Sequence, residues 1–148
     1  SSSAATIPVT LKTVNQDLGV NQNVASFVVP VGATINMDGT AIMQGLATVF
    51  IAQMSGIDLT LFQYGQVVLL AVATSIGTAA VPSAGTITLI IILQQFNLPL
   101  EAIGIILAVD RVLDMIRTSV NVTGDAAIAC IVAKSENQLD ESIFNAHK

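Results

Sequence analysis

The sequence predicts an all-α membrane protein whose helices are broken and whose helical hairpins re-enter the membrane. Hydrophobic residues make up 53% of the chain and charged residues 10%, against about 25% charged in typical soluble domains. The 42 residues between Asp58 and Glu101 include no Asp, Glu, Lys or Arg. Because one helical span needs about 20 apolar residues, we expect an integral membrane protein rather than a soluble domain with an unusually apolar core.

The expected elements alternate between long apolar segments and short polar turns. A serine-rich cap opens a semi-polar helix, and two apolar segments follow, each broken near its middle. A turn at "NLPLE" leads to a long final helix and a polar tail. The predicted ranges are 4–19 for the first helix, 25–55 and 63–97 for the broken segments, 56–62 for their connection, 100–133 for the final helix and 134–148 for a solvated, frayed tail.

Helix-breaking residues interrupt both apolar segments. The first is interrupted by "NMDGT" (36–40), and the second has Gly77, Pro82 and Gly85 at its centre. Proline removes a helical hydrogen bond and clashes with the preceding turn. Irregular backbone survives at membrane depth only where protein or water satisfies its polar groups. We therefore expect a re-entrant hairpin over 63–97. The alternative, two full helices with an exterior loop, would need ~40 helical residues.

A short internal repeat links the start of the chain to the second break. "SSSAATIP" (1–8) resembles "SIGTAAVP" (75–82), and in each case a polar cluster begins 28 residues after the closing proline, at Asn36 and at Asp110. The plan of a tip followed by a helix that bears polar groups therefore occurs twice. Internal repeats with broken helices and a site at the membrane midplane are typical of secondary transporters.

The final helix carries a polar stripe. At about 100° per residue, five polar side chains and a neighbouring threonine share a sector roughly 90° wide. They are Asp110, Asp114, Arg117, Asn121 and Asp125, with Thr118 beside them. A charge near the bilayer centre costs about 2.5–3.5 kcal/mol even on a lenient scale, so the stripe must face protein, ions or water. Because Arg111 lies off the stripe, the stripe is net negative, which favours bound cations over a closed salt-bridge network.

The break at 36–40 brings backbone groups to membrane depth. Carbonyls at the end of one half-helix can ligate a hard cation such as Na⁺, together with the carboxylate of Asp38 and the amides of Asn36 and Asn121. Free N–H groups at the start of the next half-helix can hold an anion. Gly39 makes the turn easy to form. We therefore expect a binding site at this break.

Four motifs, "NMDGT", "SIGTAAVPSAGT", "DRVLDMIRTSVNVTGD" and "SSSAATIP", together resemble the glutamate/aspartate transporter family, the dicarboxylate/amino acid:cation symporters. The resemblance runs in order over residues 1 to about 135. It implies that the chain is the C-terminal part of such a protein, beginning at the tip of its first hairpin. Residues 1–133 would then be an incomplete transport domain of an inverted-repeat transporter, without the scaffold helices.

The resemblance also implies a substrate site for an acidic amino acid. A guanidinium binds a carboxylate in a bidentate manner, and an aspartate pairs with an ammonium group. The implied residues are Arg117, Thr40 and the backbone of Gly85 for the side-chain carboxylate, Asp114, Thr118 and the carbonyl of Val81 for the amino group, and Asn121 and the backbone around Ser2 for the α-carboxylate.

The resemblance implies Na⁺ coupling, with proton-coupled transport of glutamate or a dicarboxylate as the alternative. The implied Na⁺ ligands form three groups: Gly32, Asn36, Asn121 and Asp125; Thr34, Ser75, Ile76 and Thr78; and Asn36 with Asp38 and groups outside this chain. In the family, the second hairpin tip, here residues 75–85, closes over the substrate as a gate, and the loaded domain then moves across the membrane. A homotrimer in the cell membrane, no organic cofactor and no nucleic-acid partner are also implied.

The sequence departs from the family at three positions. Met115 stands where some animal members carry a second arginine, and Ala80 and Ser83 stand where glycine is frequent at the tip. Outside these motifs, Cys130 is the only cysteine, so no disulfide can form within the chain. The only histidine, His147, lies in the tail and is expected to be exposed.

Three other interpretations stay open. A cation channel lined by the acidic stripe is one, and Arg117 within the stripe argues against it. An intramembrane aspartyl protease using Asp110 or Asp125 is another, but Val122 occupies the first glycine of its signature and no Tyr-Asp partner is present. We therefore expect no enzyme activity. The third is that the chain has no activity in isolation from its longer parent.

Overall fold

The structure, a computed structural model, describes residues 2–146, and within them the predicted all-helical class is confirmed. His147 lies outside the described residues. Apart from one isolated bridge, these residues form helices and loops. The helices are α1 (Ser3–Gln16), α2 (Gln22–Ile35), α3 (Asp38–Met54), α4 (Leu61–Ile76), α5 (Ala84–Gln95), the 3₁₀ turn η1 (Leu100–Ala102), α6 (Ile103–Ser135) and α7 (Glu141–Asn145).

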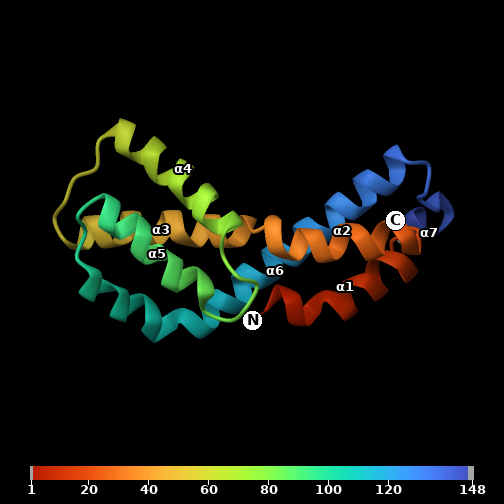
Figure 1. Ribbon diagram of the computed structural model, residues 1–148, viewed down its shortest axis with the longest axis horizontal. Helices are drawn as coiled ribbons and strands as arrows, with labels where there is room; N and C mark the ends of the chain where they lie inside the picture. Colours follow the sequence, from red (N-terminus) through yellow and green to blue (C-terminus); the bar gives the residue numbers. More distant parts are fainter. Residues whose placement is uncertain (1, 147–148) are drawn as a thin grey trace.

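The helices form an elongated molecule with two ends that meet at a polar middle (Figure 1). α1, α2 and the second half of α6 make one end, and α3, α4, α5 and the first half of α6 make the other. α6 runs through both. The start of α1 lies at the middle rather than at either end, and Ser2 contacts Ala80 in the segment that joins α4 to α5.

Each end has its own apolar core. In one core α3, α5, η1 and the start of α6 pack around Ile51, Leu89 and Leu93. In the other, α1, α2 and the end of α6 pack around Val14, Val29 and Ala129. Each core thus combines a short helix that begins within or just after a copy of the repeat (α1 or α5), the helix after it, and a third helix. The internal repeat read from the sequence therefore corresponds to two similarly built halves.

The break predicted at "NMDGT" is present. α2 ends at Ile35, Asn36 and Met37 leave the helix, and α3 begins at Asp38. The N–H of Asn36 still donates to the carbonyl of Gly32, which closes the last turn of α2. Dihedral angles of −113° and 48° at Met37 redirect the chain into α3. The interruption therefore covers two residues.

The second apolar segment also forms two helices, α4 and α5, which contact one another (Figure 1). Residues 77–83 join them without helical structure. Ser83 has a φ of +61°, the left-handed conformation that few non-glycine residues adopt. That the pair re-enters a membrane stays a prediction.

The prediction of a frayed tail is wrong for residues 136–146. Leu139 pairs with Val20 in an antiparallel bridge, and Asp140 donates its N–H to the carbonyl of Gly19 at 2.8 Å. Asp140 then caps α7 by accepting from the N–H groups of Ser142 and Ile143. The sequence "LDES" does contain a helix N-cap residue, Asp140, which favours a helix, whereas the polar composition of the tail favours a frayed end. Most of its side chains are nevertheless exposed.

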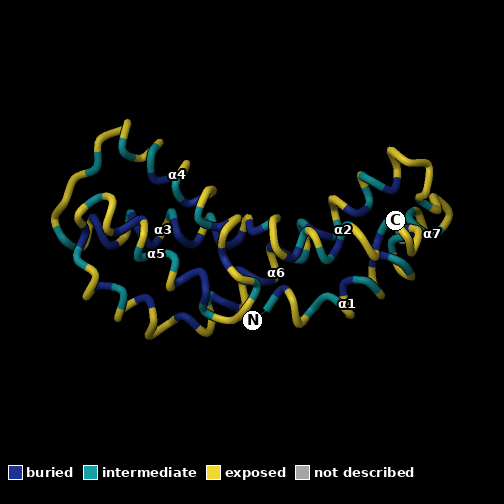
Figure 2. The backbone as a smooth tube through the Cα atoms, in the orientation of Figure 1, coloured by how far each residue is buried: buried dark blue, intermediate teal, exposed yellow. Residues whose placement is uncertain are grey.

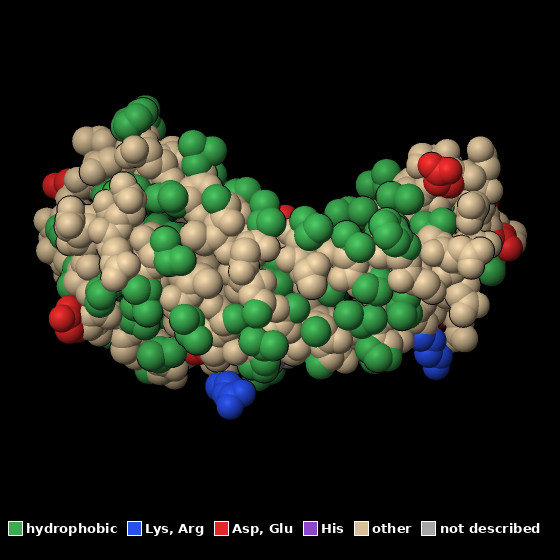
Figure 3. All heavy atoms as spheres, viewed as in Figure 1, with side chains coloured by type: hydrophobic (Ala, Val, Ile, Leu, Met, Phe, Trp, Pro, Cys, Tyr) green, Lys and Arg blue, Asp and Glu red, His purple; other side chains and the backbone are tan. Residues whose placement is uncertain are grey.

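The surface of the molecule is unusually apolar. Burial is concentrated where the helices face one another, and exposed residues line the outer faces (Figure 2). Large hydrophobic side chains remain accessible, including Phe27 (71%), Leu46 (68%) and Leu69 (72%). In Figure 3 hydrophobic side chains spread over both ends of the visible face, and charged groups are few. Among residues 2–146, no helix combines the length and the apolar character needed to cross a membrane.

Candidate functional site

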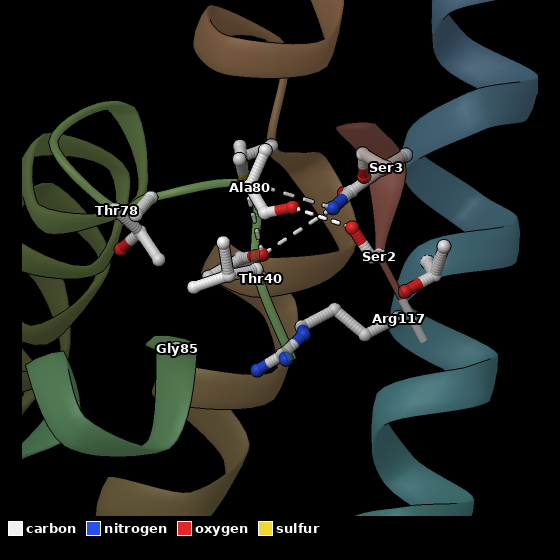
Figure 4. Close-up of a pocket in the computed structure, with 12 residues that line it drawn as sticks. Ser2, Ser3, Thr40, Thr78, Ala80, Gly85 and Arg117 are labelled. Atoms are coloured by element: carbon white, nitrogen blue, oxygen red, sulfur yellow. Dashed lines mark hydrogen bonds between the residues drawn. The ribbon is translucent and has the colours of Figure 1, made fainter. Parts of the chain in front are cut away.

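A polar pocket lies at the middle of the molecule, where both repeats and both helix breaks meet (Figure 4). It brings together seven of the eight substrate residues implied by the sequence. They are Ser2, Thr40, Val81, Gly85, Arg117, Thr118 and Asn121. The eighth, Asp114, contacts the pocket through its ion pair with Arg117. These residues span almost the whole chain, and the fold places them around one small volume.

The two repeats touch across the mouth of this pocket. The hydroxyl of Ser2 donates to the carbonyl of Ala80 at 2.8 Å, and Figure 4 shows the two residues facing one another. The same hydroxyl accepts from the N–H of Ala5 and so caps α1. The contact joins equivalent stretches of the internal repeat. Ser3 also lines the pocket and is buried.

The polar stripe of α6 faces inward, as predicted. Asp110, Asp114, Arg117, Thr118, Asn121 and Asp125 are all buried. Arg111, off the stripe, is exposed. This arrangement keeps every charged group of the stripe in contact with protein, which is what the cost of exposing charge to lipid requires.

Arg117 and Asp114 form a buried ion pair within α6. The guanidinium Nη2 contacts Asp114 Oδ1, and the side chains are 6% and 1% exposed. The remaining atoms Arg117 Nη1 and Asp114 Oδ2 are buried without a hydrogen-bond partner. Buried polar atoms normally have partners. The guanidinium therefore keeps one free donor in a residue that lines the pocket, and Asp114 keeps one free acceptor beside it.

Gly85, at the start of α5, allows the guanidinium to lie against the backbone. A Cβ at this position would collide with Arg117 Nη1 and would lie 3.0 Å from Cγ2 of Thr40. In Figure 4 the Arg117 side chain extends from α6 toward these two residues. The pocket volume open to the centre of a water molecule is about 10 Å³, room for about one water. An amino acid would therefore require the tip and Arg117 to move.

Asn121 ties the start of α3 to α6. Its Oδ1 accepts from the N–H of Gly39 at 2.8 Å, and its Nδ2 lies 3.4 Å from Thr40 Oγ1 and 3.8 Å from the sulfur of Met37. Gly39 packs so closely against the backbone of Arg117 that a Cβ would collide with its carbonyl. Sequence reasoning missed Met37 as a lining residue, although its place inside the break was a signal.

A second polar cluster lies next to the pocket and contains the predicted cation ligands Gly32, Asn36, Asp38 and Asp125. Asn36 Nδ2 donates to Asp125 Oδ1 at 3.0 Å. A Cβ on Gly32 would lie 2.5 Å from the same oxygen, so Asp125 packs directly on α2. Among the described residues, no three His, Cys, Asp or Glu side chains are grouped so that they could hold a metal ion by themselves. A cation here would therefore need backbone and amide oxygens in addition to the carboxylates of Asp38 and Asp125, and hard cations accept such ligands.

The second predicted cation group is less closely assembled. Thr34 and Ser75 donate their hydroxyls to carbonyls of Val31 and Val72 in their own helices, and Thr78, just beyond α4, donates to the carbonyl of Thr74. Thr34 and Ile76 are exposed. α2 contacts α4, but among residues 2–146 no hydrogen bond joins Thr34 to the other three. This group stays a prediction.

Two buried polar residues with contacts around the pocket belong to neither the substrate site nor the cation sites that the sequence predicts. Asp110 accepts from Ser83 Oγ and Thr86 Oγ1, both at 2.5 Å. Gln44 Nε2 donates to the carbonyl of Gly85 at 3.0 Å, and its Oε1 accepts from Thr74 at 2.8 Å. Only the three-dimensional pairing of helices reveals these contacts, because their partners lie 24 to 41 positions away.

Comparison with known proteins decides the family. Residues 1–135 match the family described as "Sodium:dicarboxylate symporter family". The chain belongs to the sodium:dicarboxylate symporter family. The resemblance found in the four motifs is thereby confirmed, and the match covers both repeats, the break at 36–40 and the whole of α6.

Individual relatives of this symporter family are similar over most of the chain. An "Excitatory amino acid transporter" of Caenorhabditis elegans is 50% identical over 131 residues, 88% of this chain and 26% of the relative. "Excitatory amino acid transporter 2" of Homo sapiens is 47% identical over 150 residues, 99% of this chain and 26% of the relative. "Excitatory amino acid transporter 3" of Mus musculus is 48% identical over 142 residues, 95% of this chain and 27% of the relative. The chain thus spans about a quarter of the length of these relatives.

Proposed function

We propose that this chain is the substrate- and ion-binding part of a secondary active transporter that takes up an acidic amino acid, glutamate or aspartate, together with Na⁺. Membership of the symporter family and the names of the relatives support this proposal. The observation that carries it is the buried pair of Arg117 and Asp114, each with one unpartnered atom, of which Arg117 lines the pocket.

The pair matches the charges of an acidic amino acid. Arg117 Nη1 can take the side-chain carboxylate, and a guanidinium is suited to this because two parallel N–H groups fit two carboxylate oxygens. Asp114 Oδ2 can accept from the ammonium group. Binding would separate the two side chains and give each a partner of opposite charge. A neutral side chain on the substrate would leave the guanidinium buried and unpaired, which is costly.

The remaining pocket groups complete the proposed substrate site. Thr40 and the Gly85 backbone lie beside the guanidinium, so they can assist in holding the side-chain carboxylate. Thr118 and the Val81 carbonyl are proposed for the ammonium group. The α-carboxylate would bind Asn121 and the backbone around Ser2, where the two repeats meet. Each group lines the same pocket.

Na⁺ is proposed to bind next to the substrate rather than in contact with it. Gly32, Asn36, Asn121 and Asp125 would hold one ion, because Asp125 supplies a carboxylate beside the open end of α2. Asn36 and Asp38 would contribute to another together with groups outside this chain, and Thr34, Ser75, Ile76 and Thr78 to a third. Oxygen ligands of this kind suit hard cations.

The tip at residues 75–85 is the proposed gate. It is closed across the pocket by the Ser2–Ala80 contact, and the pocket beneath is too small for an amino acid. If substrate and Na⁺ both favour the closed tip, each must raise the affinity of the other by the same factor. A coupling of about 2 kcal/mol corresponds to roughly a 30-fold change in affinity. The loaded domain would then move across the membrane as an elevator.

The surface supports a location inside a multi-pass protein of the cell membrane. Exposed side chains such as Phe27, Leu46 and Leu69 need a lipid or protein neighbour, since soluble monomers rarely leave large contiguous apolar areas in water. We propose that the remaining part of the parent protein supplies the scaffold and the trimer contacts.

The test is uptake of labelled glutamate and aspartate by the full-length parent protein in sealed vesicles with an inward Na⁺ gradient. Arg117→Cys is expected to abolish uptake of both, because it removes the buried guanidinium. Arg111→Cys is the matched control, since that arginine is exposed on the same helix, and it should retain uptake. Undiminished uptake by Arg117→Cys would reject the proposed site.

A titration distinguishes the coupled ion. Substrate binding is measured on the purified parent protein at several Na⁺ concentrations and, separately, at several pH values with Na⁺ constant. Affinity that falls steeply as Na⁺ is removed supports Na⁺ coupling. Affinity that depends steeply on pH but not on Na⁺ rejects it in favour of proton coupling.

A further inference from the structure

Asp110 is a buried carboxylate to which the proposed transport site assigns no role. It lies on α6, one turn before Asp114, and is 5% exposed. Its Oδ2 accepts from Ser83 Oγ and its Oδ1 from Thr86 Oγ1, each at 2.5 Å. A buried carboxylate needs strong donors to offset its lost hydration, and hydrogen bonds to a charged acceptor are about twice as strong as neutral ones. This contact therefore holds the start of α5 on α6.

A second helix holds the same turn of α5 from another side. Gln44 of α3 is fully buried, and its Nε2 donates to the carbonyl of Gly85 at 3.0 Å and to Thr88 Oγ1 at 2.6 Å. The first turn of α5 is therefore attached to α6 by Asp110 and to α3 by Gln44. Both attachments are side-chain hydrogen bonds between different helices.

The residues just before this turn are attached differently. Segment 77–82 is irregular and largely exposed. The hydroxyl of Ser2 donates to the carbonyl of Ala80, and Thr78 shares a hydrogen bond with Thr88. No charged side chain contacts segment 77–82 through a hydrogen bond among the described residues. Opening the tip therefore requires loss of neutral contacts only.

Ser83 stands at the border between the two segments. Its φ of +61° places it in the left-handed region, which is strained for a residue with a side chain and persists where the surroundings hold it. The surroundings here include Asp110, which accepts from the Ser83 hydroxyl. The carboxylate thus holds both the change of chain direction and the helix that follows.

We propose that Asp110 is a positioning residue for the gate: by accepting from Ser83 and Thr86 it anchors the first turn of α5, so that opening is confined to residues 77–82 and hinges at Ser83. This proposal rests on the proposed function, since it takes the tip to be the gate. It adds which part of the hairpin moves and which side chain prevents the rest from moving.

Pulsed spin-label distances on the purified full-length parent, with Cys130→Ser, test this proposal. One label replaces Met115 on the exposed side of α6. The second replaces either Ala79, in the tip, or Ile87, which is exposed on α5. Without Na⁺ and substrate, we expect a broad distance distribution to Ala79 and a narrow one to Ile87. Equal widths at the two positions would overturn the proposal.

Removing the anchor should free α5. Thr86→Val keeps the shape and removes the hydroxyl, and it is expected to broaden the distribution to Ile87 and to speed substrate dissociation by about tenfold. Ser83→Ala should act in the same direction. The matched control is Thr48→Val, because Thr48 is also buried but donates only to the carbonyl of Gln44 within α3.

The outcomes separate the anchor from the transport function. An unchanged Ile87 distribution in Thr86→Val overturns the role of Asp110, whatever the substrate assay shows. A parent protein that binds no acidic amino acid contradicts the proposed function, while the label distances still report whether the tip moves independently of α5. Equal effects of Thr86→Val and Thr48→Val would also overturn the anchor.

Discussion

The two halves of the sequence, each of which begins with one copy of the repeat, differ in the helix that carries their polar groups. In the first half the helix after α1 is broken at Asn36 and Met37, so that it consists of α2 and α3. In the second half the corresponding helix, α6, runs without interruption from Ile103 to Ser135. Both halves nevertheless deliver their polar groups to the same place, the middle of the molecule.

The difference shows two ways of bringing polar groups into an apolar environment. A continuous helix satisfies its own backbone, so α6 offers side chains: Asp114, Arg117, Asn121 and Asp125. A broken helix leaves carbonyl and N–H groups without intrahelical partners, and the N–H of Gly39 bonds to Asn121. A side chain of α6 thus provides the hydrogen-bond partner that a backbone group at the break lacks within its own helix.

The largest expected effect comes from removing a charged side chain of α6, the carboxylate of Asp125. Asp125→Asn should raise the Na⁺ concentration for half-maximal uptake by about 10- to 100-fold or more, because losing even an outer-shell partner of a metal costs about that much. Glu136→Gln also replaces a carboxylate by an amide, but at an exposed position, and should leave this Na⁺ concentration unaltered. Na⁺-dependent uptake curves of the parent protein provide the measurement. A change in substrate selectivity with constant Na⁺ dependence would contradict the assignment.

The next effect tests the close approach of the broken helix to α6. Gly39→Ala should destabilise the protein by about 1–3 kcal/mol, because the added Cβ meets the backbone carbonyl of Arg117, which cannot move aside. Gly45 lies on another face of α3, where an added Cβ would meet no neighbouring atom within 4 Å. Gly45→Ala should therefore stabilise the folded protein by about 0.5–1 kcal/mol. Thermal unfolding of the purified parent measures both. Equal shifts in the two variants would show that the packing against α6 is unimportant.

The smallest effect concerns the tail that closes one end. Hydrogen bonds from the Ser142 hydroxyl and from the N–H groups of Ile143 and Ser142 lower the pKa of Asp140 below its ordinary value of 3.8. The cap therefore contributes stability above that value, and the contribution is lost as the pH falls through the lower pKa of the folded state. The protection of the α7 amides against hydrogen exchange, relative to the intrinsic exchange rate at the same pH, should fall at acid pH in the parent. In Asp140→Ala this protection should already be lost at neutral pH, and protected amides there would contradict the cap.

Several features were predictable because they depend on local chemistry. The inward stripe of α6 follows from helical periodicity and the cost of exposing charge to lipid, and the structure buries every member of it. The break at Asn36 follows from a cluster of polar residues with a glycine inside an apolar segment. The cap of α7 depends on equally local residues, but the polar composition of the tail points instead to a frayed end.

The sequence by itself determined the helices, their breaks, the polar face of α6 and, through its motifs, the family. Only the tertiary structure decided which groups meet: Ser2 with Ala80, Asn36 with Asp125, and Asp110 with Ser83 and Thr86. Periodicity orients a side chain about its own helix axis, but it contains no information about which neighbour packs there. That choice depends on how two apolar cores, built from helices distant in the chain, position the polar residues between them.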